Sequence, residues 1–149
     1  MHPRQVIEYL LPSKNIGGRV LNAGLTHQLR MLHAGAGDPG IVLAAFRSGV
    51  VFVPRDADGR VWTGDEGGIR WIWAFSTEAA MVAFARARGH QGPELDWLTV
   101  RGSRLLDVAV PAVGVPCGVA LDVGSAQPML FPPLRGIVPD AVALDGEEN

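Results

Sequence analysis

The sequence contains very little cysteine. Cys117 is the only one in 149 residues, which excludes an internal disulfide and any metal site built from several cysteines. A chain with a single thiol fits a reducing compartment, so we expect the protein in the cytoplasm.

Long apolar runs are also missing. No stretch reaches the ~18–20 apolar residues that a helix needs to cross a bilayer. The apolar run at residues 6–11 is too short for a secretory signal and is interrupted by Glu8. We therefore expect a soluble protein without a membrane anchor or a signal peptide.

The chain has no excess of positive charge. It has 13 Lys and Arg against 15 Asp and Glu, a net charge of −2, which gives it no general attraction to nucleic acid or to an acidic membrane. The acids gather near the end, where Asp140, Asp145, Glu147 and Glu148 have no base among them. This pattern predicts a flexible acidic tail over residues 135–149.

The chain does have a strand joined directly to a helix, at residues 69–89. Trp71, Trp73 and Phe75 fall on one face of the strand, and the opposite face is also apolar, so we expect a central strand covered on both sides. An alanine-rich helix follows over residues 77–88. We expect Ser76 to cap its first turn, since a serine hydroxyl can accept a hydrogen bond from a free N–H there.

The rest of the chain predicts one domain over residues 19–134, preceded by a leader at residues 1–18. Two helices should come first, at residues 22–33 and after the N-cap Asp38, with Ile41 pointing inward and Gly49 ending the second. Further strands are expected at residues 50–53, 60–63, 95–100 and 118–123, with turns at residues 56–59 and 64–68. The strands at residues 50–53, 60–63 and 69–75 should form an antiparallel meander of sequential neighbours. A short helix is expected after residue 102, and a short pairing segment at residues 129–131. The fold class is α+β: a central, mainly antiparallel sheet of about five strands with helices packed on it and an N-terminal helical pair.

Three short motifs give this order of elements a family likeness. They are a strand ending in Val-Pro at residues 50–54, a strand-to-helix step at residues 73–78 and a glycine-led strand end at residues 118–125. The chain resembles the N-terminal domain of SseB-family proteins, a bacterial family named for an enhanced serine sensitivity phenotype. At the third motif Asp122 and Val123 stand where the family pattern has asparagine and proline. The likeness covers about residues 20–133 and implies an α+β domain with no established enzymatic activity, no catalytic residue and no cofactor.

The residues themselves assemble no recognisable catalytic or metal site. Ser125 lies on a glycine turn but lacks the Gly-x-Ser-x-Gly pattern that exposes a nucleophile. His27 and His33 are six residues apart, which is not the spacing that puts two ligands on one helix face. The acids at residues 56–58 lack the glutamate that a calcium loop requires. We therefore predict no catalytic residue, no metal and no cofactor.

Two hypotheses for function follow. The first is a non-catalytic protein-interaction module whose surface includes Trp71, Trp73 and Phe75, because half-covered aromatic side chains serve as anchors for partners. The partner would be another protein or a second copy of the chain, with a homodimer through residues 2–48 as one form. The second is a small-molecule sensor or an enzyme, whose site lies where two strand ends meet. Its residues would be Ser76, Asp122, Gly124 and Ser125, since strand-to-helix steps expose N–H groups that hold anions.

Overall fold

The computed structural model describes residues 23–90 and 95–145. The leader predicted at residues 1–18 lies outside this part of the chain, as does the end of the predicted tail. The described residues confirm the α+β class. The helices are α2 (Ala23–His33), α3 (Pro39–Ser48), α4 (Glu78–Ala87), α5 (Gly102–Arg104) and α6 (Val110–Val113). The strands are β1 (Val50–Arg55), β2 (Thr63–Glu66), β3 (Ile69–Ala74), β4 (Asp96–Arg101), β5 (Cys117–Leu121) and β6 (Met129–Phe131).

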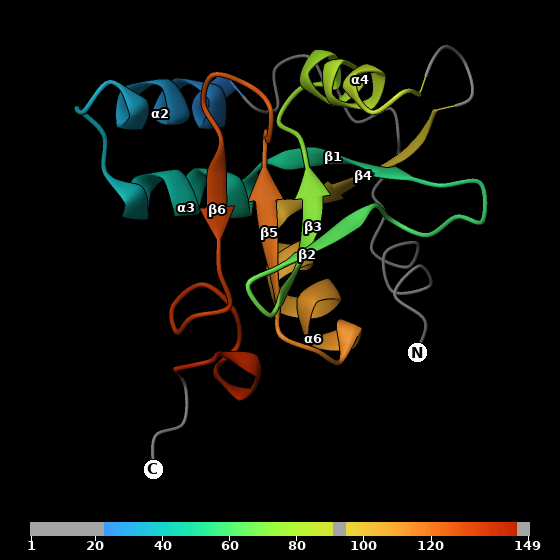
Figure 1. The fold of residues 1–149 in the computed structure, drawn as a ribbon. Helices are drawn as coiled ribbons and strands as arrows, with labels where there is room; N and C mark the ends of the chain where they lie inside the picture. Colours follow the sequence, from blue (N-terminus) through green and yellow to red (C-terminus); the bar gives the residue numbers. More distant parts are fainter. Residues whose placement is uncertain (1–22, 91–94, 146–149) are drawn as a thin grey trace.

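The helical pair is confirmed. Helices α2 and α3 lie side by side next to β6 (Figure 1). Asp38 caps α3 by accepting the N–H of Gly40 at 2.8 Å, with Pro39 at the first helical position, where its missing N–H costs nothing. The prediction for Ile41 is wrong: its side chain is 51% exposed, because the buried stripe of α3 runs through Val42 and Phe46.

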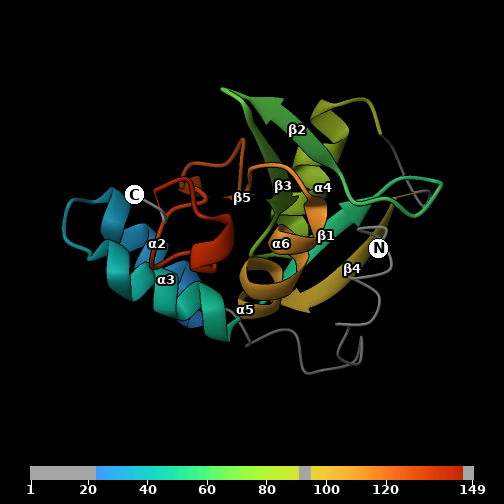
Figure 2. The same cartoon turned by 90° about the horizontal axis from the view of Figure 1, so that it is seen from below.

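The strands form two sheets within the described ranges. Strands β2, β3, β5 and β6 make a four-stranded sheet in that order, and β1 pairs with β4 in a two-stranded antiparallel sheet. The backbones of Phe52 and Phe75 exchange two hydrogen bonds of 2.8 Å, which connect β1 to the residue after β3. Seen from below, α2 and α3 lie on one side and the β1–β4 pair on the other, with α6, β3 and β5 between them (Figure 2).

Two details of the predicted sheet are corrected. We expected β1, β2 and β3 to form a meander of sequential neighbours, but the main partner of β1 is β4. The segment before β2 reaches β1 through a bridge between Val61 and Arg55 and a hydrogen bond of 2.9 Å from the Trp62 N–H to the Pro54 carbonyl. The return strand also starts later than expected, so residues 64–66 belong to β2 and the tight turn is Gly67-Gly68. The central position of β3 is confirmed, with β2 antiparallel on one side and β5 parallel on the other.

The core lies between the sheet and the helical elements around it. Ile72 and Ala74 of β3 face it and are fully buried, as is every residue of β5. The rings of Phe46 and Phe131 stack with centroids 4.5 Å apart and connect α3 to β6. Between β4 and β5, the chain runs through α5, a π-helical turn at Leu105–Ala109 and α6.

The predicted tail is corrected as far as Asp145. Val138 is 4% exposed and belongs to the core, and Asp140–Val142 forms a 3-10 turn. The N–H of Arg135 donates to the Asp145 carboxylate at 2.8 Å. Apolar side chains of this segment, such as Val138, therefore hold it against the domain. In the described ranges no helix is both long enough and apolar enough to cross a membrane.

Candidate binding site

The aromatic face of β3 is half covered. Phe75 is fully buried, whereas Trp71 and Trp73 each keep part of their surface in solvent. Each indole lies over a glycine of the neighbouring strand. A Cβ at Gly64 of β2 would come within 2.6 Å of Trp73 Cζ2, and one at Gly118 of β5 within 2.8 Å of Trp71 Cζ3. The two indoles are thus packed into the sheet on one side and exposed on the other.

Helix α4 covers the end of this face through one side chain. The ring of Phe84 contacts Trp73 edge-on at 4.9 Å and Phe75 at 5.2 Å between centroids. It also lies 6.3 Å from the ring of Trp62, which precedes β2. Met81 and Ala85 of α4 are buried. Phe84 therefore determines how far the helix covers the tryptophans.

Ser76 does not cap α4, which corrects our expectation. Thr77 is the N-cap, and its hydroxyl accepts the N–H of Ala80 at 3.0 Å. Ser76 bonds instead to Asp122: its N–H donates to Oδ1 at 2.8 Å and its hydroxyl donates to Oδ2 at 2.6 Å. Both residues are 5% exposed. The adjacent threonine has the same capping chemistry, which leaves the serine to hold the carboxylate.

The two strand ends predicted to form a site do meet. Asp122 follows β5 and has a backbone φ of 56°, and its N–H donates to the carbonyl of Ala74 at 2.9 Å. Burial raises the pKa of the Asp122 carboxyl, and the two bonds from Ser76 oppose that rise. Gly124 and Ser125 lie in the exposed turn beyond, where the Ser125 hydroxyl accepts the N–H of Gln127 at 3.0 Å.

This arrangement bears on the anion site expected there. The N–H of Ser76 was one of the donors that an anion would use, and it already donates to the Asp122 carboxylate. A carboxylate next to the N-terminus of α4 is also favoured by the helix dipole. The protein's own side chain therefore occupies the position that we had assigned to a ligand.

A hollow opens at the other end of α4, beside the hairpin that connects β1 to β2. We call it the hairpin hollow, and its volume is about 380 Å³. Its lining consists of Asp56, Arg60, Val61, Trp62, Thr63, Trp73, Arg88 and His90. Of the residues that we predicted for a partner surface or a ligand site, only Trp73 belongs to it.

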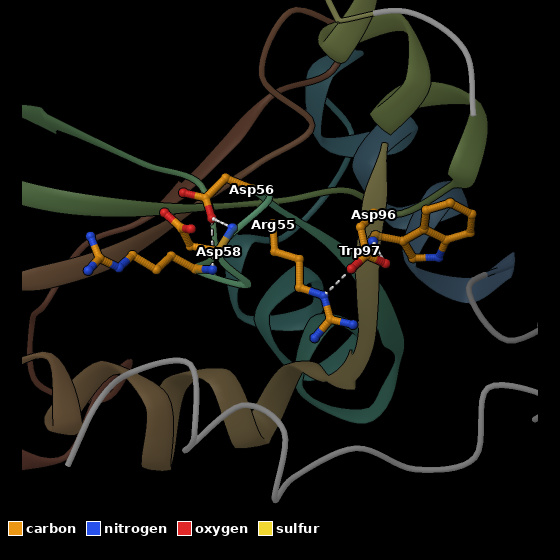
Figure 3. Close-up of polar contacts among 6 residues, drawn as sticks. Arg55, Asp56, Asp58, Asp96 and Trp97 are labelled. Atoms are coloured by element: carbon orange, nitrogen blue, oxygen red, sulfur yellow. Dashed lines mark hydrogen bonds and ion pairs between the residues drawn. The ribbon is translucent and has the colours of Figure 1, made fainter. Parts of the chain in front are cut away.

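The hairpin turn fixes one wall of the hollow. Oδ1 of Asp56 accepts the N–H groups of Asp58 at 2.9 Å and Arg60 at 3.0 Å, as Figure 3 shows for the turn. Gly59 takes the positive φ of 82° that the Asp-Gly pair predicted. The base of the hairpin is held by an ion pair of 2.7 Å between Arg55 on β1 and Asp96 on β4 (Figure 3).

The end of α4 fixes the opposite wall. Gly89 has a φ of 91°, which an L-residue with a Cβ rarely adopts. Its N–H donates to the carbonyl of Arg86 and the N–H of His90 donates to that of Ala85, both at 2.9 Å. These are the two bonds of a Schellman C-cap. The cap places Arg88 and His90 on either side of Gly89, next to the tryptophans.

Two ring contacts complete the hollow. The guanidinium of Arg88 lies 4.4 Å from the Trp73 ring centroid and 5.2 Å from that of Phe84. The imidazole of His90 lies 4.6 Å from the ring of Trp62. Sequence analysis missed Arg88, His90 and Trp62 as a group. A signal did exist, since a glycine followed by a polar residue after an alanine-rich helix is typical of a C-cap.

The described ranges hold no group of three or more His, Cys, Asp or Glu side chains that could bind a metal ion. Comparison of the whole sequence with protein-family models gives no match, and a search of the curated proteins finds no relative.

Proposed function

We propose that the protein is a non-catalytic, SseB-like binding domain that contacts a partner protein through the hairpin hollow. The observation that supports this most is the half-exposed Trp73, which packs against Phe84 and Gly64 and has the guanidinium of Arg88 4.4 Å from its ring centroid. Tryptophan and arginine are the side chains that dominate the energy of protein interfaces, particularly where neighbouring groups keep them in place. A rigid anchor loses little conformational entropy when a partner binds.

The strand ends at Ser76 and Asp122 support the small-molecule alternative less well. Their polar groups bond to each other and are buried, whereas the hollow presents its polar groups at the surface. In our proposal the Ser76–Asp122 pair stabilises the fold and places α4, and the protein is not an enzyme.

Two variants test the binding role of Trp73. Trp73→Leu removes the anchor, and Trp97→Leu is the matched control, because Trp97 is also a half-buried tryptophan on a strand but does not line the hollow. We expect a cross-linked partner from native-host extract to be recovered with wild type and with Trp97→Leu, and lost with Trp73→Leu. Thermal unfolding of both variants confirms that they are folded. Equal recovery with both variants would overturn the proposal.

We also propose a bacterial, cytoplasmic protein that forms a homodimer through the region of residues 2–48. The exposed Ile41 on α3 supports a contact there, although much of that region lies outside the described residues. Ile41→Arg on the full chain should give a monomer in size-exclusion chromatography with light scattering, whereas wild type should give a dimer. A monomeric wild type would remove the dimer from the proposal.

A further inference from the structure

The hairpin hollow contains two arginines, Arg60 and Arg88. Within the described residues, neither Arg60 nor Arg88 makes an ion pair. Ion pairs join Arg47 to Asp107, Arg55 to Asp96 and Arg70 to Asp65. The one carboxylate in the lining, Asp56, already accepts two backbone N–H groups of its own turn. The hollow therefore carries two guanidinium groups against one carboxylate, and neither guanidinium is engaged in an ion pair within the described residues.

A ring contact holds Arg88 at the hollow. Its guanidinium carbon lies 4.4 Å from the centroid of the Trp73 ring, a cation–π contact that uses none of the N–H donors. The N–H donors lie in the plane of a guanidinium and point outward from its edge, where they match the two oxygens of a carboxylate. The Schellman cap at Gly89 fixes the backbone from which Arg88 extends. Little side-chain freedom is then lost when an oxyanion binds.

An apolar wall stands next to these cations. Trp62, with His90 against its ring, and Val61 line the same hollow as Arg60 and Arg88. The volume of about 380 Å³ lies within the usual range for ligand sites. A ligand that fits both features carries an oxyanion close to an apolar or aromatic group.

The hollow continues into the free edge of a sheet. Thr63 lines the hollow and begins β2, the outermost strand of the four-stranded sheet in the described ranges. An extended peptide can add to such an edge through its backbone while its side chains enter a pocket at the end. This continuity favours a peptide segment over a free small anion. Asp65 and Glu66 lie farther along β2 and repel acidic side chains. The acidic part of such a peptide would therefore lie at the hollow and not along the strand.

We propose that the hairpin hollow binds an acidic segment of the partner protein, with a carboxylate on Arg88 and Arg60 and an adjacent apolar side chain against Trp62. The proposal rests on the binding role given to the hollow above and specifies the chemistry of its ligand. Complementary charge across the rim also makes the association dependent on ionic strength.

The test uses the full chain and three probes: the peptide acetyl-Glu-Phe-Glu-Phe-Glu amide, its twin with glutamine in place of glutamate, and inorganic phosphate. Calorimetric titration at low ionic strength should show that the acidic peptide binds at least about tenfold more tightly than its twin, since hydrogen bonds to charged groups discriminate on this scale. Arg88→Gln should weaken binding of the acidic peptide about tenfold, and Arg88→Lys by less, because lysine keeps the charge but not the planar donors.

Arg86→Gln is the matched control, because Arg86 is an exposed arginine in the last turn of the same helix and does not line the hollow. It should leave the affinity unchanged. Equal binding of both peptides, or equal effects of Arg88→Gln and Arg86→Gln, would overturn the inference. Binding of phosphate without binding of the acidic peptide would also overturn it, in favour of a free anion. If neither the acidic peptide nor phosphate binds while partner capture still depends on Trp73, the inference fails and the proposed function stands.

Discussion

The pair of Ser76 and Asp122 gives the sharpest test of how this fold is held together. It connects the end of β3 to the end of β5 through two short hydrogen bonds to one buried carboxylate. We expect Asp122→Ala to destabilise the protein by about 3–5 kcal/mol. The variant removes the acceptor of two hydrogen bonds from buried donors, and the loss of such a partner costs about 1–3 kcal/mol per group, not fully additively.

The backbone of Asp122 adds to that cost. Its φ of 56° lies in the left-handed region, which asparagine and aspartate tolerate better than alanine. Asp122→Asn keeps the shape, one carbonyl acceptor and the tolerance of positive φ, so it should cost about 1 kcal/mol. The difference between the two variants then measures what the second acceptor and the backbone contribute.

The effect of pH follows from the raised pKa of Asp122. Burial makes the folded protein hold this proton more tightly than the unfolded chain, whose carboxyl keeps its ordinary pKa of 3.8. Between pH 3.8 and the raised pKa of the folded state, the native protein therefore binds more protons than the unfolded chain. The contribution of Asp122 to stability is fully present below pH 3.8 and falls as pH rises through the folded-state pKa. The cost of Asp122→Asn should accordingly be larger in acid than at neutral pH.

Urea unfolding followed by tryptophan fluorescence measures all of these differences. Asp107→Ala is the control, because Asp107 is an exposed aspartate in an ion pair with Arg47 and should cost no more than about 1 kcal/mol. The reasoning is refuted if Asp122→Ala costs no more than this control, or if Asp122→Asn costs as much as Asp122→Ala. A cost of Asp122→Asn that grows with pH would refute the linkage argument alone.

Three further variants or reactions probe other parts of the domain. Phe84→Ala should cost about 2–4 kcal/mol in urea unfolding, because the half-buried ring contacts three aromatic neighbours, and Phe84→Leu should cost less. Gly89→Ala should cost about 1–3 kcal/mol through its positive φ, whereas Gly24→Ala, in open space on α2, should be neutral or stabilising by up to about 1 kcal/mol; equal effects would contradict the role given to the cap. Burial raises the pKa of Cys117 to about 12, so a disulfide reagent at pH 8 should label it only as fast as the protein unfolds, and rapid labelling of the native protein would be inconsistent with that.

Local rules predicted those parts of the fold that depend on neighbours in sequence. The N-cap at Asp38 and the Asp-Gly hairpin are set within a few residues, and the structure confirms both. The pairing of β1 with β4 does not depend on neighbours in sequence, because β2, β3 and α4 lie between the two strands in the chain. A sequence pattern shows that a strand exists, but its partner is decided by which arrangement buries the most apolar surface.

The cap of α4 shows the same limit at the scale of one side chain. Ser76 and Thr77 have equivalent hydroxyls, and either could accept the N–H of the first turn. What separates them is Asp122, 46 residues away, which engages Ser76 from another strand. The sequence thus correctly predicted that the two strand ends meet, although it could not show that they would bond to each other.

The hairpin hollow could not be predicted because its residues come from separate parts of the chain: the segment from the turn after β1 to the start of β2, the end of β3 and the end of α4. The comparison of the two ends of α4 explains why binding should occur at this one. At the N-terminus the helix dipole faces Asp122, a carboxylate of the same chain that is already buried. At the C-terminus the dipole favours a cation, and the sequence supplies Arg88 there, exposed and without a carboxylate partner among the described residues. Substitutions at the two ends should therefore affect different quantities. Asp122 variants should change the free energy of unfolding, and Arg88 variants should change the affinity for an acidic ligand.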